Sequence, residues 1–291
     1  MGQQGEIYEK TPVYNFTYLL FFTGLSVLLY PTVSNYVNGK NQSKAIASYV
    51  ESMEQMDAST YEELLTEAKA YNEQLLSKQA RFAMEGEALE QYLQLLHSDG
   101  GAIGYLEIDA IDVTLPLYLG NSPAILQVGA GTMPGSSLPV GGPSTHAVIT
   151  GHRGLPSSRL FTDLDQVAEG DVFVLHVLNE TLFYQVDQIR IVEPQDLSEL
   201  DIQEGKDFCT LITCTPYGIN THRMLVRGHR IEDSQMDAVD YRVTADAIEV
   251  DTLLVAPILA LPLLVILVVC LFLRDKKKPR KSKKTKGRRE Q

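Results

Sequence analysis

The stretch VFVLHVLNETLFYQVDQIRIV, residues 172–192, decides the fold class of this 291-residue chain. It holds two runs rich in β-branched and aromatic residues, which favour strands, on either side of a short polar break. Similar short runs recur after Ile103, and Gly, Pro, Asn and Asp clusters separate most of them. The predicted strands are 104–108, 113–117, 147–150, 172–177, 182–192, 209–214 and 223–231. Many short strands without long intervening helices predict a mainly β fold, either a barrel or a sandwich.

The region before these strands has a helical pattern, which covers most of residues 43–97. Ser59-Thr60-Tyr61-Glu62 has the spacing of a capping box, so we predict a helix start there. One apolar stripe follows at helical spacing: Tyr61, Leu64, Leu65, Ala68, Tyr71 and Leu75. We expect this stripe to pack on the β-rich domain and not to bind a cofactor. Gly86 marks a break before a second helical stretch, Glu87 to Leu96.

A membrane-spanning helix is predicted near the C-terminus, where Leu253 to Leu273 form 21 residues without a charge. A stretch of that length spans the roughly 30 Å hydrocarbon core of a bilayer. The tail from Arg274 to Gln291 holds 11 basic and 2 acidic residues, so the positive-inside rule places it in the cytoplasm. Because the whole chain still carries −12, the rest of it is strongly acidic, which argues against nucleic-acid binding.

Val13 to Val37 form a second apolar stretch, which is either a cleaved signal peptide or a retained signal anchor. We expect a retained anchor, because the preceding residues are weakly charged and no A-x-A-like cleavage site follows. Both termini would then be cytoplasmic, and residues from about 38 to 252 would face the outside.

The three cysteines are Cys209, Cys214 and Cys270. Cys270 lies in the C-terminal apolar run, where it is predicted to be a small buried hydrophobe. The other two lie on one predicted strand, roughly 16 Å apart and on opposite faces. That separation exceeds the reach of a disulfide, so one of these thiols is free for chemistry.

Three residues could form a catalytic site. Cys214 ends a predicted strand just before Pro216, His152 follows another strand between nearby glycines, and Arg223 opens a strand nine residues after Cys214. A hairpin of that length can return Arg223 to the thiol. Taken singly, each is equally well explained as a structural cysteine, a loop histidine or a surface arginine, and we expect Arg227 and Arg230 to be ordinary surface arginines.

Together, the three side chains supply a nucleophile, an acid/base and a cation. A free thiol has a pKa of about 8.5 and attacks only as the thiolate, which neighbouring cations favour. Histidine can protonate an amine leaving group, whereas arginine stays charged and suits an oxyanion. A rival zinc site would combine Cys214 with His146, His152, His222 or His229, but these spacings match no common metal motif.

Several motifs resemble those of a known family, the sortases. Thr210-Leu211-Ile212-Thr213-Cys214 matches their T-L-x-T-C signature. Two further segments, 150–156 (TGHRGLP) and 220–230 (NTHRMLVRGHR), resemble the histidine and arginine segments of class C, the pilus-assembling sortases. Other matching segments are 104–108, 137–142 and 160–165. The similarity extends from about residue 43 to 231, and the basic-tailed C-terminal helix also fits class C.

The resemblance implies an eight-stranded sortase β-barrel with an N-terminal helical extension and flanking transmembrane helices. It implies a cysteine transpeptidase that cleaves an LPXTG-like sorting signal of a secreted protein between Thr and Gly. Cys214 would form the thioester, with His152 as acid/base and Arg223 as oxyanion stabiliser, and a pilin lysine would resolve it. The family's catalytic residues use no metal or organic cofactor. The enzyme would be a multi-pass membrane protein of a Gram-positive type envelope, with its catalytic domain outside.

The expected division of the chain follows from these assignments. Its parts are a cytoplasmic N-terminus (1–12), a transmembrane signal anchor (13–37), a helical extension or lid region (38–100), the catalytic barrel (101–232), a juxtamembrane linker (233–252), a transmembrane helix (253–273) and a basic cytoplasmic tail (274–291). Three alternative functions remain open at this point. They are a sortase that anchors surface proteins to a cell-wall amine, a membrane-bound cysteine hydrolase and a non-catalytic surface-binding or scaffold protein.

One departure from class C concerns the lid that usually covers the active site with an Asp-Pro-aromatic motif. The corresponding segment here, residues 77–86, reads SKQARFAMEG and contains no Asp-Pro pair. Either Phe82 or Met84 could cover the site instead, and the alternative is that both simply pack on the barrel.

Overall fold

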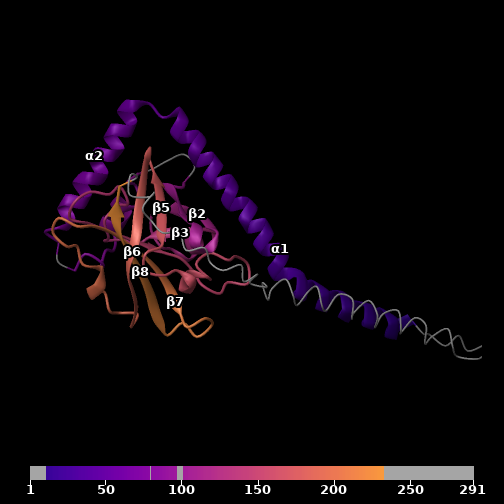
Figure 1. Ribbon diagram of the computed structural model, residues 1–291. Coiled ribbons are helices and arrows are strands. Elements are labelled where there is room, and N and C mark those ends of the chain that lie inside the picture. The colour runs from indigo at the N-terminus through magenta and orange to yellow at the C-terminus, as the bar shows by residue number, and fades with distance from the viewer. Residues whose placement is uncertain (1–10, 79, 97–100, 233–291) are drawn as a thin grey trace, which may run out of the picture. The chain divides into compact units, whose positions relative to one another are not determined.

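The computed structural model describes residues 11–78, 80–96 and 101–232. Eight strands form a closed barrel in the order β1-β2-β3-β4-β7-β8-β6-β5 (Figure 1). The strands are β1 (Gly104–Ile108), β2 (Val113–Tyr118), β3 (Ala130–Thr132), β4 (Thr145–Thr150), β5 (Val172–Val177), β6 (Glu180–Val192), β7 (Asp207–Thr215) and β8 (His222–Ile231). The predicted mainly β fold is confirmed, and it is a barrel and not a sandwich.

All seven predicted strands are present, and β1 and β5 have the predicted bounds. The sequence pattern missed β3, whose three residues, Ala-Gly-Thr, carry no strand preference of their own. This strand exists because its neighbours supply the pairing, with Leu117 of β2 opposite Ala130 and Ile149 of β4 opposite Thr132. Without β3 the sheet would have an open edge between β2 and β4.

Alternating residues of the strands fill the barrel. On β5, Phe173, Leu175 and Val177 are fully buried, while the residues between them are half-buried. Phe173 stacks on Tyr184 of β6 with ring centroids 5.5 Å apart. Gly228 of β8 faces this pair, and a Cβ there would lie 2.8 Å from the Phe173 ring, so only glycine fits.

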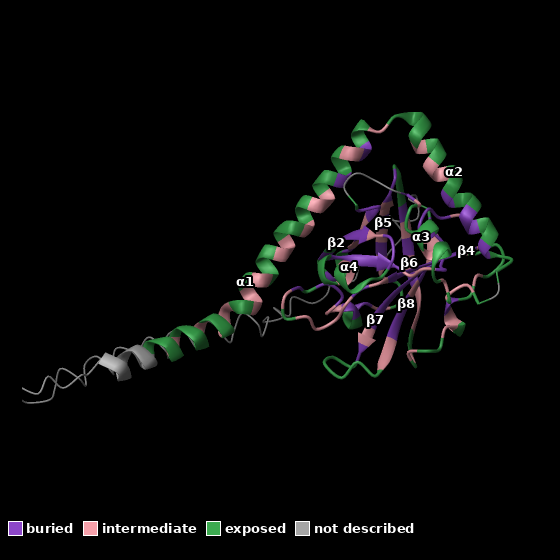
Figure 2. Ribbon diagram, turned by 180° about the vertical axis from the view of Figure 1, so that it is seen from behind, coloured by how far each residue is buried: buried purple, intermediate pink, exposed green. Residues whose placement is uncertain are grey.

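The described part of the chain also contains four helices: α1 (Thr11–Gln55), α2 (Ala58–Leu75), α3 (Glu87–Tyr92) and α4 (Pro123–Val128). Figure 2 shows that α1 and α2 are exposed along most of their described length, whereas the strands are largely buried. Three short 3₁₀ turns complete the set: η1 (Asp109–Ile111), η2 (Leu164–Gln166) and η3 (Ser198–Leu200). The second predicted helical stretch is therefore shorter than expected, because α3 ends at Tyr92 and only turns follow.

The predicted start of α2 was wrong by two residues. Asp57, not Ser59, is the N-cap, and its carboxylate accepts the Thr60 N–H at 2.9 Å. The carboxylate also accepts both neighbouring hydroxyl groups, so it satisfies more donors than a serine can. The apolar stripe does pack on the barrel as predicted, since Ala68, Tyr71 and Leu75 are buried.

One helix in the described part of the chain is long and apolar enough to cross a membrane, and the span assigned to it is Tyr18–Gln55. The predicted anchor thus continues without a break into the extension region as one helix, α1. A signal sequence would have the same properties, so retention of the anchor stays a prediction. The second predicted span, the basic tail and Cys270 lie outside the described residues. Among the described residues, those from Val33 onward form one compact unit with the barrel, and those up to Thr32 belong to another.

Asn72 of α2 attaches the helical extension to the barrel. Its side chain is buried, donates to the Leu138 carbonyl at 3.1 Å and accepts from the Leu138 N–H at 2.7 Å. We expect Asn72→Ala to lower the free energy of unfolding by about 1–3 kcal/mol, because it leaves both backbone groups unpaired. Urea unfolding measures this, with Glu73→Ala on the exposed face as the control. Equal midpoints for the two variants would contradict the prediction.

Candidate active site

The parallel pairing of β4 with β7 brings the His152 segment to Cys214. The register places Thr150 opposite Ile212. It continues past the end of β4, because the Gly151 N–H donates to the Ile212 carbonyl at 3.0 Å and the Thr213 hydroxyl donates to the Gly151 carbonyl at 2.9 Å. These two bonds bring the His152 segment alongside the end of β7, where Cys214 lies.

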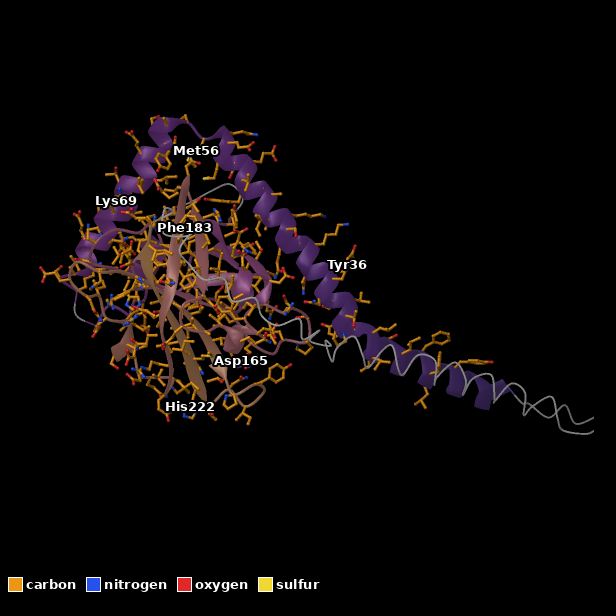
Figure 3. The ribbon with its side chains drawn as sticks, in the orientation of Figure 1. Tyr36, Met56, Lys69, Asp165, Phe183 and His222 are labelled. Carbon is orange, nitrogen blue, oxygen red and sulfur yellow. The ribbon has the colours of Figure 1, made fainter. Side chains whose placement is uncertain are left out.

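The antiparallel pairing of β7 with β8 brings Arg223 to the other side of the cysteine. Cys214 and Arg223 are direct partners in this ladder, and opposite residues project from the same face of a sheet. The segments that carry the three predicted residues therefore come together at one end of three adjacent strands, β4, β7 and β8. Figure 3 marks this end by Asp165 and His222, at the bottom of the barrel, while Phe183 and Met56 lie at the top. The chemical roles of the three residues remain predictions.

The two described cysteines differ in their environment. Cys214 is half-buried and within reach of a ligand, whereas Cys209 is completely buried in the barrel. Burial raises the pKa of the Cys209 thiol well above its usual value, so this thiol stays protonated and unreactive. Both thiols are free, as the strand geometry predicted.

Burial also lowers the pKa of the half-buried His152 ring below its usual value. The shift favours the neutral imidazole, the form that accepts a proton. The backbone around this ring is held firmly, because the His152 carbonyl accepts the Phe161 N–H at 3.0 Å. The glycines on either side of His152 leave room for aromatic rings of the protein itself. A Cβ on Gly151 would lie 2.5 Å from the Phe161 ring, and one on Gly154 would lie 3.1 Å from the Tyr217 ring.

Sequence reasoning misjudged one arginine of the barrel, Arg227, and missed another, Arg153, beside the candidate site. Arg227 is not an ordinary surface residue, because its guanidinium donates twice to Asp187 at 2.9 and 3.3 Å and lies over the Phe208 ring. Arg153, next to His152, has a side chain only 8% exposed. It pairs with Asp165 and reaches the Thr215 hydroxyl at 3.4 Å, which joins the histidine segment to the residue after Cys214.

The outer face of the sheet beside Cys214 carries an apolar patch. Ile212 lies two residues before Cys214 and Leu225 two residues after Arg223, so both share the face of the candidate site. Together with Val148 and Leu200 they form a buried cluster separate from the barrel core, which we call the outer patch. This patch could receive an apolar segment of a ligand that reaches the thiol.

The connector between α2 and α3 covers the outer patch. Phe82 packs on the patch, whereas Met84 packs against the main core, so only Phe82 lies on the face of the candidate site. Arg81 holds it there, with its guanidinium 4.5 Å from the Phe82 ring, a hydrogen bond to the Leu200 carbonyl and an ion pair with Asp201 at 3.7 Å. Gly135 permits this approach, because a Cβ would lie 2.0 Å from the Arg81 carbonyl.

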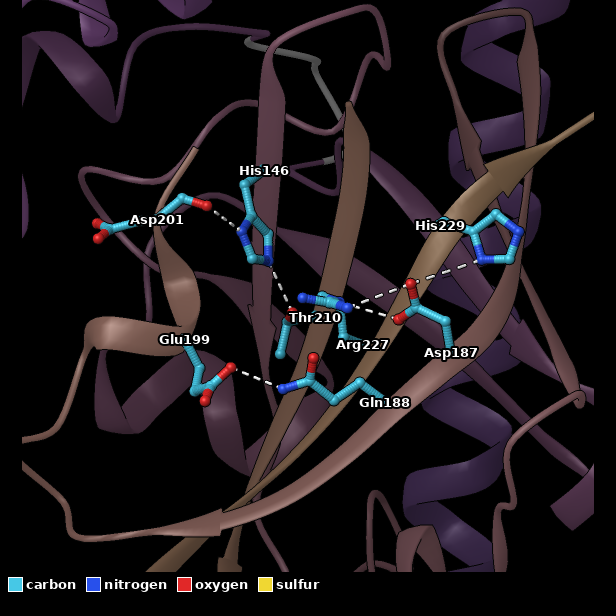
Figure 4. Close-up of polar contacts among 8 residues, drawn as sticks. All are labelled: His146, Asp187, Gln188, Glu199, Asp201, Thr210, Arg227 and His229. Atoms are coloured by element: carbon cyan, nitrogen blue, oxygen red, sulfur yellow. Dashed lines mark hydrogen bonds and ion pairs between the residues drawn. The ribbon is translucent and has the colours of Figure 1, made fainter. Parts of the chain in front are cut away.

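A polar network lies further along the same face (Figure 4). His146 of β4 bonds the Asp201 carbonyl at 3.0 Å and the Thr210 hydroxyl at 2.7 Å, so both ring nitrogens are engaged. The Gln188 amide donates to Glu199 at 2.6 Å, and these contacts together fix the segment between β6 and β7. Because both of its ring nitrogens bind other parts of the protein, we assign His146 a structural role. Within the described ranges, no group of three or more His, Cys, Asp and Glu side chains could hold a metal ion.

Comparison with known proteins places this geometry in a family. Residues 106–231 match the sortase domain. The structure of sortase C1 from Streptococcus agalactiae is 49% identical, covers 65% of this chain and 99% of its own, and superposes with a TM-score of 0.63. The chain belongs to the sortase family. Sortase C from Streptococcus pneumoniae is also similar to this sortase, at 48% identity with 65% and 97% of the two chains covered and a TM-score of 0.59. The resemblance to class C is thereby confirmed.

Among curated proteins, this sortase is 28% identical to sortase A of Streptococcus agalactiae over 141 residues. That match covers 47% of this chain and 56% of the relative, so it spans little more than half of the relative's length. Sortases are transpeptidases, and the family assignment therefore argues against a scaffold protein without chemistry.

His146 predicts a pH dependence of stability. Burial lowers its pKa from 6.5 to about 4. Between these values the unfolded chain binds the proton more strongly, so the free energy of unfolding falls as the pH drops from about 6.5 towards 4. The contribution lost is on the order of 3 kcal/mol. Urea unfolding of wild type and His146→Gln at pH 7 and pH 4.5 measures it, with the more exposed His222→Gln as control. Equal pH dependence in wild type and His146→Gln would show that His146 does not contribute.

Proposed function

We propose that this sortase cleaves an LPXTG-like sorting signal between Thr and Gly and transfers the acyl group to a lysine amine of a pilin. The observation that carries the proposal is the strand register, which aligns Cys214 with Arg223 on β8 and with the His152 segment beyond β4. This register supports a site in which an imidazole and a guanidinium flank one accessible thiol.

In the first half-reaction, the Cys214 thiol passes its proton to the neutral His152 ring. The sulfur then attacks the carbonyl carbon of the threonine and forms a C–S bond. The carbonyl electron pair moves to oxygen, and Arg223 stabilises that negative charge with its N–H groups. His152 then gives a proton to the glycine nitrogen, and the C–N bond breaks. A thioester on Cys214 and a free glycine amine result.

In the second half-reaction, an incoming lysine amine attacks the thioester carbon. His152 takes a proton from this amine, the C–S bond breaks, and the Cys214 thiolate leaves. The products are an isopeptide bond and the regenerated enzyme. Binding, in this proposal, places the leucine and proline of the signal near the outer patch, because the patch is apolar and shares the face of Cys214.

The choice of a pilin as the acceptor rests on the class C relatives. The similar Streptococcus pneumoniae enzyme is described in terms of pilin substrate specificity. The alternatives are a cell-wall precursor amine, as in a sortase that anchors surface proteins, and water. The curated sortase A relatives keep the first alternative open.

The catalytic roles predict the activity of single variants. With full-length enzyme in detergent and a peptide containing Leu-Pro-Glu-Thr-Gly, wild type forms a thioester that mass spectrometry assigns to Cys214. We expect no adduct with Cys214→Ala and no product with His152→Ala. Arg223→Lys keeps the charge but loses the planar donors, so kcat falls roughly 10²–10³-fold. Cys209→Ala serves as the matched control and keeps the adduct. An adduct in Cys214→Ala would refute the assignment.

The same assay separates the acceptors. A recombinant pilin domain, a cell-wall-type oligoglycine amine and buffer alone are offered to the wild-type thioester. The proposal expects an isopeptide bond to a pilin lysine. Exclusive transfer to oligoglycine would favour the anchoring alternative, and release to water in the presence of both amines would favour a hydrolase.

Phe82 is predicted to compete with the peptide for the outer patch. When a binding-competent state is only partly populated, the apparent affinity falls by that fraction. We therefore expect Phe82→Ala to lower KM about 3- to 10-fold with little change in kcat. Steady-state kinetics measures this, and Met84→Ala is the control because Met84 packs on the main core. A KM that stays the same or rises in Phe82→Ala would show that Phe82 does not block the patch.

A further inference from the structure

The loop that carries His152 is closed at its base and held at its tip. We call residues 151–163 the histidine loop. At the base, Phe161 donates its N–H to the His152 carbonyl, and its fully buried ring lies against Gly151. At the tip, Leu155 and Ser158 form an isolated bridge, and Ser158 is buried although most of its neighbours are partly exposed. A displacement of the tip is therefore passed to the backbone of His152.

The tip of the histidine loop is contacted by α1, a helix 110 or more residues earlier in the chain. The Asn38 amide donates to the Ser157 carbonyl at 2.7 Å. The Asn35 amide oxygen accepts the Arg159 N–H at 3.0 Å. The Gln42 amide donates to the Ser158 hydroxyl at 3.2 Å and to the Val128 carbonyl at 3.0 Å.

These three side chains form one stripe, because the spacings of three and four residues place them on the same face of α1. They belong to the same compact unit as the barrel. All three are neutral amides, and they bind two backbone groups and one hydroxyl of three consecutive loop residues. The stripe thus holds the backbone of the loop tip in place. Most side chains of the loop tip could change without loss of these hydrogen bonds.

We propose that Asn35, Asn38 and Gln42 are positioning residues, which hold the histidine loop so that the His152 ring faces Cys214. The inference rests on the proposed function, in which His152 is the acid/base. Proton transfer is sensitive to geometry, and a misplacement of about 1 Å can reduce a rate roughly 10²-fold. The segment of α1 next to the barrel therefore takes part in building the site.

The two asparagines differ in their hydrogen-bond roles, because Asn38 donates whereas Asn35 accepts, so the same Asn→Asp change should affect them differently. Asn38→Asp removes a donor and sets a carboxylate against a carbonyl, while Asn35→Asp keeps the acceptor. We expect Asn38→Asp to lower kcat for amide cleavage roughly 10- to 100-fold and Asn35→Asp to stay within about twofold of wild type. Gln42→Glu also removes a donor and serves as the second variant if Asn38→Asp does not fold.

Two control variants separate positioning of the loop from simple attachment of the helix. The Gln55 amide bonds only Glu51 of the same helix among the described contacts, so Gln55→Ala should have no effect. Tyr49 attaches α1 to Leu178, far in sequence from the histidine loop, through a hydroxyl bond of 3.2 Å. Tyr49→Phe loosens the attachment of the helix without touching the loop and should leave kcat within about twofold of wild type.

A second readout distinguishes a displaced histidine from a general loss of activity. An ester peptide with a p-nitrophenol leaving group needs no proton from His152, whereas the amide does. Full-length enzyme in detergent is assayed with the Leu-Pro-Glu-Thr-Gly amide and the matching ester. In Asn38→Asp we expect the amide rate to fall about tenfold more than the ester rate. An equal fall for both substrates, or the same fall in Asn35→Asp and Tyr49→Phe, would overturn the proposal.

Hydrogen–deuterium exchange tests the coupling without any substrate. Amides of residues 151–163 should exchange about tenfold faster in Asn38→Asp than in wild type, Asn35→Asp or Gln55→Ala. If wild type processes no peptide, the proposed function fails, and exchange alone then decides whether α1 orders the loop. Unchanged exchange together with unchanged amide cleavage in Asn38→Asp would refute the inference.

Discussion

The parallel pairing between β4 and β7 is the contact on which the candidate site depends. It continues past the end of β4, through the Gly151 N–H and the Thr213 hydroxyl, and thereby brings the His152 segment alongside the cysteine strand. β8 pairs with β7 on the other side and adds Arg223. Because β7 lies between the two partners, a slip of one residue in either pairing would turn its residue to the wrong face.

Because side chains alternate between the two faces of each strand, the outer face of β4, β7 and β8 carries two distinct regions. Moving away from Cys214, the outer patch comes first and the polar network of His146, Thr210 and Arg227 follows. The first can bind apolar side chains, and the second fixes the segment between β6 and β7. Phe82 and Arg81 lie across both regions, since Phe82 packs on the patch and Arg81 pairs with Asp201. A covering segment is thus present although the Asp-Pro motif of class C is not.

The helical extension has a larger part in this arrangement than its exposure suggests. α2 is attached through Asn72 to the backbone of Leu138, and α1 reaches the histidine loop through three amide side chains. In both cases neutral side-chain amides bind backbone groups of the barrel. Such bonds are directional and insensitive to salt, so they fix position more than they add stability.

Local sequence was enough to predict seven of the eight strands, the barrel or sandwich class, and the hairpin that links Cys214 to Arg223 across nine residues. Each of these follows from side-chain alternation or short chain reach, and the family motifs then selected the barrel. The N-cap at Asp57 was missed because the capping-box spacing from Ser59 to Glu62 pointed to Ser59. Strand β3 was missed because its own residues have no strand preference. Only the tertiary structure decided that β4 pairs with β7, which brings the His152 segment to the cysteine strand. It also decided which partners Arg153, Arg227 and the stripe on α1 bind. Those contacts join segments whose separation in the chain no local pattern encodes, because they depend on which strands become neighbours in the closed barrel.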